Sequence, residues 1–81
     1  MNQINRIFET SNFYLSAFLL ANGLIMLGIE RTNSGKGSFV FQDQDSRTGF
    51  VDQFLYGQPS VDVRKLIAAI RQLKSGLYDG P

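Results

Sequence analysis

Three short stretches of the chain predict β-strands, and in the first of them apolar and polar residues alternate with the two-residue period of a strand. These stretches are residues 6–10, 24–32 and 38–42. Residues 33–37 separate the second from the third and have the Asn, Ser and Gly content of a hairpin turn. Residues 24–32 are apolar on both faces in their first half, so we expect them to form the central strand.

The alternation also predicts which side chains share a face. In residues 24–32, one face carries Leu24, Met26, Gly28 and Glu30, and the other carries Ile25, Leu27, Ile29 and Arg31. In residues 38–42, Phe39 and Phe41 share one face and Val40 takes the other. No basic residue lies between the two phenylalanines, which favours core packing over stacking on nucleic-acid bases.

The first helix is expected from residue 13 to about Asn22, after three candidate N-caps, Thr10, Ser11 and Asn12. Its side chains are apolar in almost every direction, so it lies centrally or pairs with another chain. Asn22 and Gly23 end it, because glycine accepts a positive φ. Since this stop interrupts the apolar run of residues 13–29, the run predicts a helix and a strand and not a membrane span.

Two further helices follow the third strand. Asp45 or Ser46 can cap the first of them, Gly57 ends it, and its apolar stripe is Phe50, Val51, Phe54 and Leu55. Ser60 or Asp62 can cap the second, which runs to about residue 77. Its apolar positions are Val63, Leu66, Ile67, Ile70, Leu73 and Leu77.

The predicted order is therefore β-α-β-β-α-α, which gives an α+β single domain. We expect a three-stranded antiparallel sheet packed against three helices. Residues 6–77 form the domain, residues 1–5 a flexible N-terminus and residues 78–81 a frayed C-terminus. A chain of 81 residues has room for one small core only.

Composition excludes several classes of function. The chain has no His and no Cys, which removes His-based triads, thiolate nucleophiles, disulfide scaffolds and the usual zinc sites. Eight Lys and Arg against seven Asp and Glu give a net charge of +1, so charge alone draws the chain to neither nucleic acid nor membrane. Without a signal-peptide pattern, the prediction is a cytoplasmic protein.

A family resemblance is carried by residues 10–23, by Gly28-Ile29-Glu30-Arg31, by Phe39-Val40-Phe41, by the helix end at residues 51–57, and by Val61-Asp62 and Leu73-Lys74. The chain resembles a family of small prokaryotic and mobile-element proteins known only as a domain of unknown function. The resemblance covers about residues 7–77 and implies an α+β fold without a catalytic motif. It also implies a mobile-element accessory role. Val63 stands where the pattern has Pro after the capping Asp62.

Candidate chemistry is sparse, and we expect no enzyme, no metal and no cofactor. Lys36 lies between two glycines but also between two strands, which favours a hairpin over a phosphate loop. Asp43, Asp45 and Asp52 lack the spacing of a calcium loop and suit a helix N-terminus. Ser16, among apolar neighbours, is expected to bond back to its own helix.

A basic stripe on the last helix is the first candidate contact surface. At 100° per residue, Arg64, Arg71 and Lys74 share a flank, and Arg31 and Lys36 on the hairpin could extend it. The stripe could contact phosphates of DNA or RNA, or it could be a solvated face near a helix C-terminus.

Surplus apolar surface is the second candidate. The first helix and the second strand carry more apolar residues than 81 residues readily bury, and leftover area marks an interface. Tyr14, Phe18 and Tyr56 are the candidate anchors. The sequence therefore predicts a non-enzymatic interaction module that self-associates or binds a protein partner. The alternative is a nucleic-acid-binding accessory protein, and no small-molecule ligand is indicated.

Overall fold

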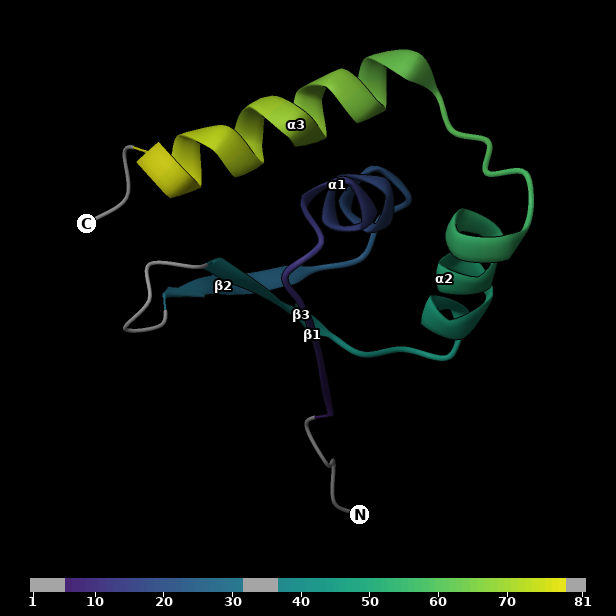
Figure 1. Ribbon diagram of the computed structural model, residues 1–81, viewed down its shortest axis with the longest axis horizontal. Helices are drawn as coiled ribbons and strands as arrows, with labels where there is room; N and C mark the ends of the chain where they lie inside the picture. Colours follow the sequence, from purple (N-terminus) through teal and green to yellow (C-terminus); the bar gives the residue numbers. More distant parts are fainter. Residues whose placement is uncertain (1–5, 32–36, 79–81) are drawn as a thin grey trace.

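A computed structural model describes residues 6–31 and 37–78 of the chain (Figure 1). The elements are β1 (Ile7–Thr10), α1 (Phe13–Ala21), β2 (Met26–Arg31), β3 (Gly37–Gln42), α2 (Ser46–Tyr56) and α3 (Val63–Tyr78). The predicted α+β class and element order are confirmed. Most of the predicted hairpin turn, all of the predicted flexible N-terminus and residues 79–81 lie outside the described residues.

The three strands form an antiparallel sheet in the order β1-β3-β2. The prediction that residues 24–32 form the central strand is wrong, because β1 pairs with β3 along its whole length and leaves β2 at an edge. Two of the apolar residues that suggested a central strand are open to solvent: Ile25 is 53% exposed and Leu27 55%.

Strand β2 also departs from strict alternation. Its pairing with β3 shifts between Met26 and Gly28, which leaves Leu27 as an extra residue in a β-bulge. Cross-strand partners share a face of the sheet. Met26 and Ile29 therefore lie on the same face, each opposite a phenylalanine of β3, although alternation placed them on opposite faces.

Helices α1 and α3 lie on the same side of the sheet, and α2 packs beside α1 (Figure 1). Five consecutive residues of α1, from Leu15 to Leu19, are buried, so the expected central position of this helix is confirmed. The buried hydroxyl of Ser16 donates to the carbonyl of Asn12 at 2.9 Å, as predicted. The core cluster comprises Leu15, Ala17, Leu19, Leu24, Phe39, Phe41, Ala69 and Leu73.

Both ends of α1 follow from local sequence. Of the three candidate caps, Asn12 is the one used: its Oδ1 accepts the N–H of Leu15 at 3.0 Å. At the other end Gly23 has φ 95°, and its N–H donates to the carbonyl of Leu20 at 3.0 Å. These bonds satisfy backbone groups that a helix end leaves without partners.

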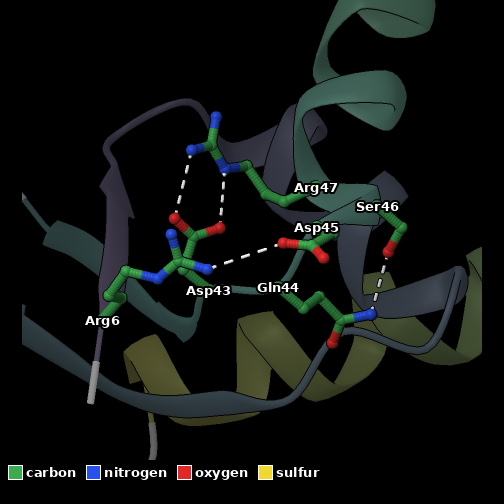
Figure 2. A network of polar contacts seen from close by, with 6 residues as sticks. All are labelled: Arg6, Asp43, Gln44, Asp45, Ser46 and Arg47. Carbon is green, nitrogen blue, oxygen red and sulfur yellow. Dashed lines mark hydrogen bonds and ion pairs between the residues drawn. The ribbon is translucent and has the colours of Figure 1, made fainter. Parts of the chain in front are cut away.

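A charged network fixes the start of α2 against the sheet (Figure 2). Arg47 donates from Nε and Nη2 to the two carboxylate oxygens of Asp43, at 3.0 and 3.2 Å. The hydrogen bond from Arg47 holds the pKa of Asp43 below its ordinary value, and the same bond raises the pKa of Arg47. The guanidinium also lies 4.4 Å from the centre of the Phe8 ring. The network therefore joins β1, β3 and α2.

The predicted N-cap of α2 has the expected position but not the expected hydrogen bond. Asp45 occupies the N-cap position, but its side chain makes no capping hydrogen bond. Its carboxylate instead lies 3.6 Å from the guanidinium of Arg6 (Figure 2). Gly57 ends the helix as predicted. The orientation of α2 thus depends mainly on the Asp43–Arg47 pair and on the packing of its phenylalanines.

Candidate binding groove

An apolar groove opens between α1, α2 and α3. It has a volume of about 280 Å³, and no charged residue lines it. Its lining residues are Tyr14, Phe18, Phe54, Pro59, Val61, Leu66 and Ile70. The volume lies just below the range of about 300–1,000 Å³ typical of small-molecule sites, so the groove can hold a few apolar side chains.

The floor of the groove is aromatic. Phe18 is only 3% exposed, and its ring centre lies 5.6 Å from that of Phe54 and 6.1 Å from that of Phe50. These aromatic contacts hold α2 on α1, although none of the α2 residues is buried. The floor is therefore preformed by the packing of two helices.

The three candidate anchors do not all lie at the groove. Tyr14 lines it and is 65% exposed, and Phe18 forms its floor. Tyr56, which is 83% exposed, is the last residue of α2 and is not among the lining residues. The structure thus brings Tyr14 and Phe18 together and leaves Tyr56 elsewhere on the surface.

Leu66 and Ile70 of α3 form the third wall of the groove. This helix buries Ala69 and Leu73, whereas Val63 is 67% exposed and Ile67 45%. Relative to Leu73, the side chains of Val63 and Ile67 are turned by about 80–120° around the helix axis. The apolar stripe that predicts this helix is therefore wider than the side of the helix that packs on the core.

The basic residues of α3 are exposed. Within residues 6–31 and 37–78, Arg64, Arg71 and Lys74 take part in no ion pair. Lys74 lines a second hollow of about 240 Å³, which shares Tyr14 with the groove. Helix α3 carries Lys65 as a fourth cation and no acidic residue.

Arg31 lies at the other end of α3 from Arg64. Its Nη2 donates to the carbonyl of Leu77, so it links β2 to the C-terminal end of the helix, where a cation is favourable. Arg64 precedes Leu77 by thirteen residues, or roughly 20 Å along the helix axis. Lys36 lies outside the described residues. That the five cations act together stays a prediction.

The carboxylate of Asp62 is engaged at the start of α3. A hollow of about 450 Å³ between α1 and α3 includes Asp62, whose Oδ1 accepts the backbone N–H groups of Arg64 at 2.8 Å and Lys65 at 3.1 Å. Asp62 is therefore the cap of α3. In the described part of the chain, acidic residues form no group of three that could hold a metal ion.

Sequence reasoning did not single out five of the groove residues. They are Phe54, Pro59, Val61, Leu66 and Ile70. In the sequence these residues belong to apolar helical stripes or to the segment between α2 and α3. That pattern does not distinguish a groove wall from a core position.

None of the described helices is long and apolar enough to cross a membrane.

Comparisons with known proteins give a family and no activity. Neither the search of curated proteins nor the search of solved structures found a match. The model of the family Domain of unknown function (DUF5659) matches residues 5–79, and the chain therefore belongs to this family.

Proposed function

We propose that this chain is a non-enzymatic cytoplasmic interaction module whose groove binds apolar side chains of a protein partner. The observation that carries the proposal is an open groove lined entirely by uncharged residues, with Tyr14 65% exposed at its edge. Covering apolar surface contributes about 25 cal/mol for each Å² removed from water. Tyrosine is also a residue type enriched among strong interface anchors.

The charges beside the groove favour an acidic partner segment. Lys74 lines the hollow that shares Tyr14 with the groove, and Arg71 lies one turn before it on α3. Electrostatic complementarity selects partners and speeds encounter. The occupant we infer is a segment with apolar anchors and acidic residues next to them. A mobile-element accessory role remains what the family resemblance implies.

The test is a pull-down of the tagged protein from lysate of its native host, with and without nuclease, using two matched variants. Tyr14→Asp places a charge in the groove, whereas Tyr56→Asp makes the same change on an exposed tyrosine outside it. We expect Tyr14→Asp to lower recovery of a nuclease-resistant partner at least about tenfold, since burial of a large apolar side chain contributes about 1.5–3 kcal/mol. Equal recovery with both variants would contradict the groove.

The alternative function is binding of nucleic acid by Arg64, Arg71 and Lys74, which are exposed and form no ion pair with described residues. Phosphate-driven binding weakens steeply as salt rises, whereas apolar association does not. Recovery that disappears with nuclease, and with Arg64→Glu combined with Arg71→Glu, would favour this alternative. Unchanged recovery in the double variant would argue against it.

A further inference from the structure

The face of the sheet opposite α1 and α3 carries its exposed apolar side chains and two glutamates along its edges, and Val40 at its centre is 7% exposed. Glu9 lies opposite Val40 on β3, and Glu30 lies opposite Ser38. No described helix covers this face (Figure 1). We call it the outer sheet face and define it as Ile7, Glu9, Ile25, Leu27, Glu30 and Val40. Ile7, Ile25 and Leu27 are each more than half exposed, at 53%, 53% and 55%.

Helix α3 presents a basic and apolar ridge on the side turned away from the core. By helical geometry, this ridge lies opposite the buried Leu73. We call it the outer ridge and define it as Arg64, Ile67, Ala68, Arg71 and Tyr78. All five residues are exposed, Ile67 by 45% and Tyr78 by 78%.

The two surfaces are complementary in charge. The outer sheet face contains two acids, and its described residues include no cation. The outer ridge contains two arginines and no acid. A contact between two outer sheet faces would bring glutamates together, and like charges across an interface are costly.

The spacing of the charges also matches. Glu9 and Glu30 are two strands apart and two residues apart along the sheet, which separates their backbones by about 12 Å. Arg64 and Arg71 are seven residues apart on one helix, or about 10 Å. An α-helix laid on the outer sheet face can therefore bring each arginine near one glutamate.

We propose that the outer ridge of one copy of this chain docks on the outer sheet face of a second copy. The two surfaces lie on opposite sides of the molecule (Figure 1), so the contact is head-to-tail and each copy can bind two others. None of its residues lines the groove, so Tyr14→Asp tests the groove without altering this contact, although Arg71 enters both proposals.

The contact is small. A helix of 16 residues is about 24 Å long and a three-stranded sheet about 14 Å wide, so the footprint is roughly 340 Å² on each copy. A standard protein interface buries about 800 Å² on each partner. The association is accordingly weak, and its charge pairs make it sensitive to salt.

Sedimentation velocity on purified, nucleic-acid-free protein tests the proposal, at concentrations from about 10 µM to 1 mM, where weak complexes dissociate. The variants reverse the charges of one surface at a time: Glu9→Lys with Glu30→Lys, and Arg64→Glu with Arg71→Glu. We expect the wild type to gain mass with concentration and each double variant to associate at least about tenfold more weakly. Because all four side chains are exposed, the variants should fold, which circular dichroism verifies.

Mixing the two double variants gives the decisive result. Each then meets a copy of opposite charge, so the mixture and the fourfold charge-swapped chain should both recover association. A control that reverses Asp52 and Lys65, which lie on neither surface, should behave as the wild type. A wild type that stays monomeric over this range, a mixture that stays monomeric, or an Arg64→Glu, Arg71→Glu variant that associates normally would each overturn the proposal.

Discussion

Replacement of Gly23 by alanine tests how α1 is joined to the core. Gly23 has φ 95° and follows the last helical turn. Its N–H donates to the carbonyl of Leu20 at 3.0 Å, and the N–H of Leu24 donates to that of Leu19 at 3.1 Å. These two bonds define a Schellman motif. The motif turns the chain so that Leu24, which is 2% exposed, enters the core beside α1.

The cost of Gly23→Ala comes from the backbone, because a Cβ at this position would have no atom within 4 Å. A left-handed conformation costs a non-glycine residue about 1–2 kcal/mol. The smaller conformational freedom of the unfolded alanine chain offsets about 0.4–1 kcal/mol of this. We therefore expect the free energy of unfolding to fall by about 1 kcal/mol.

Gly49→Ala is the matched control. Gly49 lies in α2, has no positive φ, and a Cβ there would also have no atom within 4 Å. In a helix, alanine is about 1 kcal/mol more favourable than glycine, so this variant should gain stability. The two variants should differ by about 2 kcal/mol, or roughly 8–16 °C in Tm, in urea and thermal unfolding followed by circular dichroism. Equal shifts in the two variants would refute the Schellman assignment.

Three further substitutions test the core, the charged network and the cap of α3. Leu73→Ala, at a side chain that is 0% exposed, should cost about 2–5 kcal/mol and leave much of the chain unfolded by circular dichroism. Asp43→Asn should cost about 1–2 kcal/mol at pH 7, because it breaks the charge-assisted pair with Arg47. The pKa of Asp43 is lowered in the folded state. The stability difference between wild type and Asp43→Asn should therefore persist above about pH 4 and vanish as pH falls through the folded pKa. Urea titrations at several pH values check this pH dependence. Asp62→Ala should cost about 1 kcal/mol, because Oδ1 accepts two backbone N–H groups of the first turn, and urea unfolding measures the loss.

Local chemistry made much of the fold predictable. Asn22 and Gly23 end α1 because glycine accepts the positive φ of the turn. Gly57 ends α2, as expected, but with a negative φ. Asp62 caps α3 because a short carboxylate reaches the free N–H groups of the first turn. Each of these features depends on neighbours within a few residues, which a sequence displays directly.

The errors in the sheet came from pairing between distant residues. An apolar stretch predicts burial, yet Ile25 and Leu27 are exposed because they lie on the outer sheet face, which no described helix covers. The bulge at Leu27 likewise depends on the register with β3 and not on the composition of β2. The pattern of apolar and polar residues does not indicate such a one-residue shift in strand pairing.

The groove shows the same limit. Tyr14 and Phe18 were predicted as anchors from one helix, but the walls come from α2, α3 and the segment between them. Whether Leu66 and Ile70 face the core or the groove depends on how α3 crosses α1, which sequence periodicity does not specify. The apolar character of these residues was therefore predictable from the sequence. That residues from three helices and a connecting segment line one groove was not.

Site-specific photo-crosslinking in cells of the native host tests the central claim most directly. A photoreactive phenylalanine analogue would replace Tyr14 at the groove in one strain and Tyr56 outside it in another. The groove account predicts a defined protein adduct from position 14 that resists nuclease, is lost with Ile70→Glu and is absent from position 56. The same adduct from both positions, or none from position 14, would contradict it.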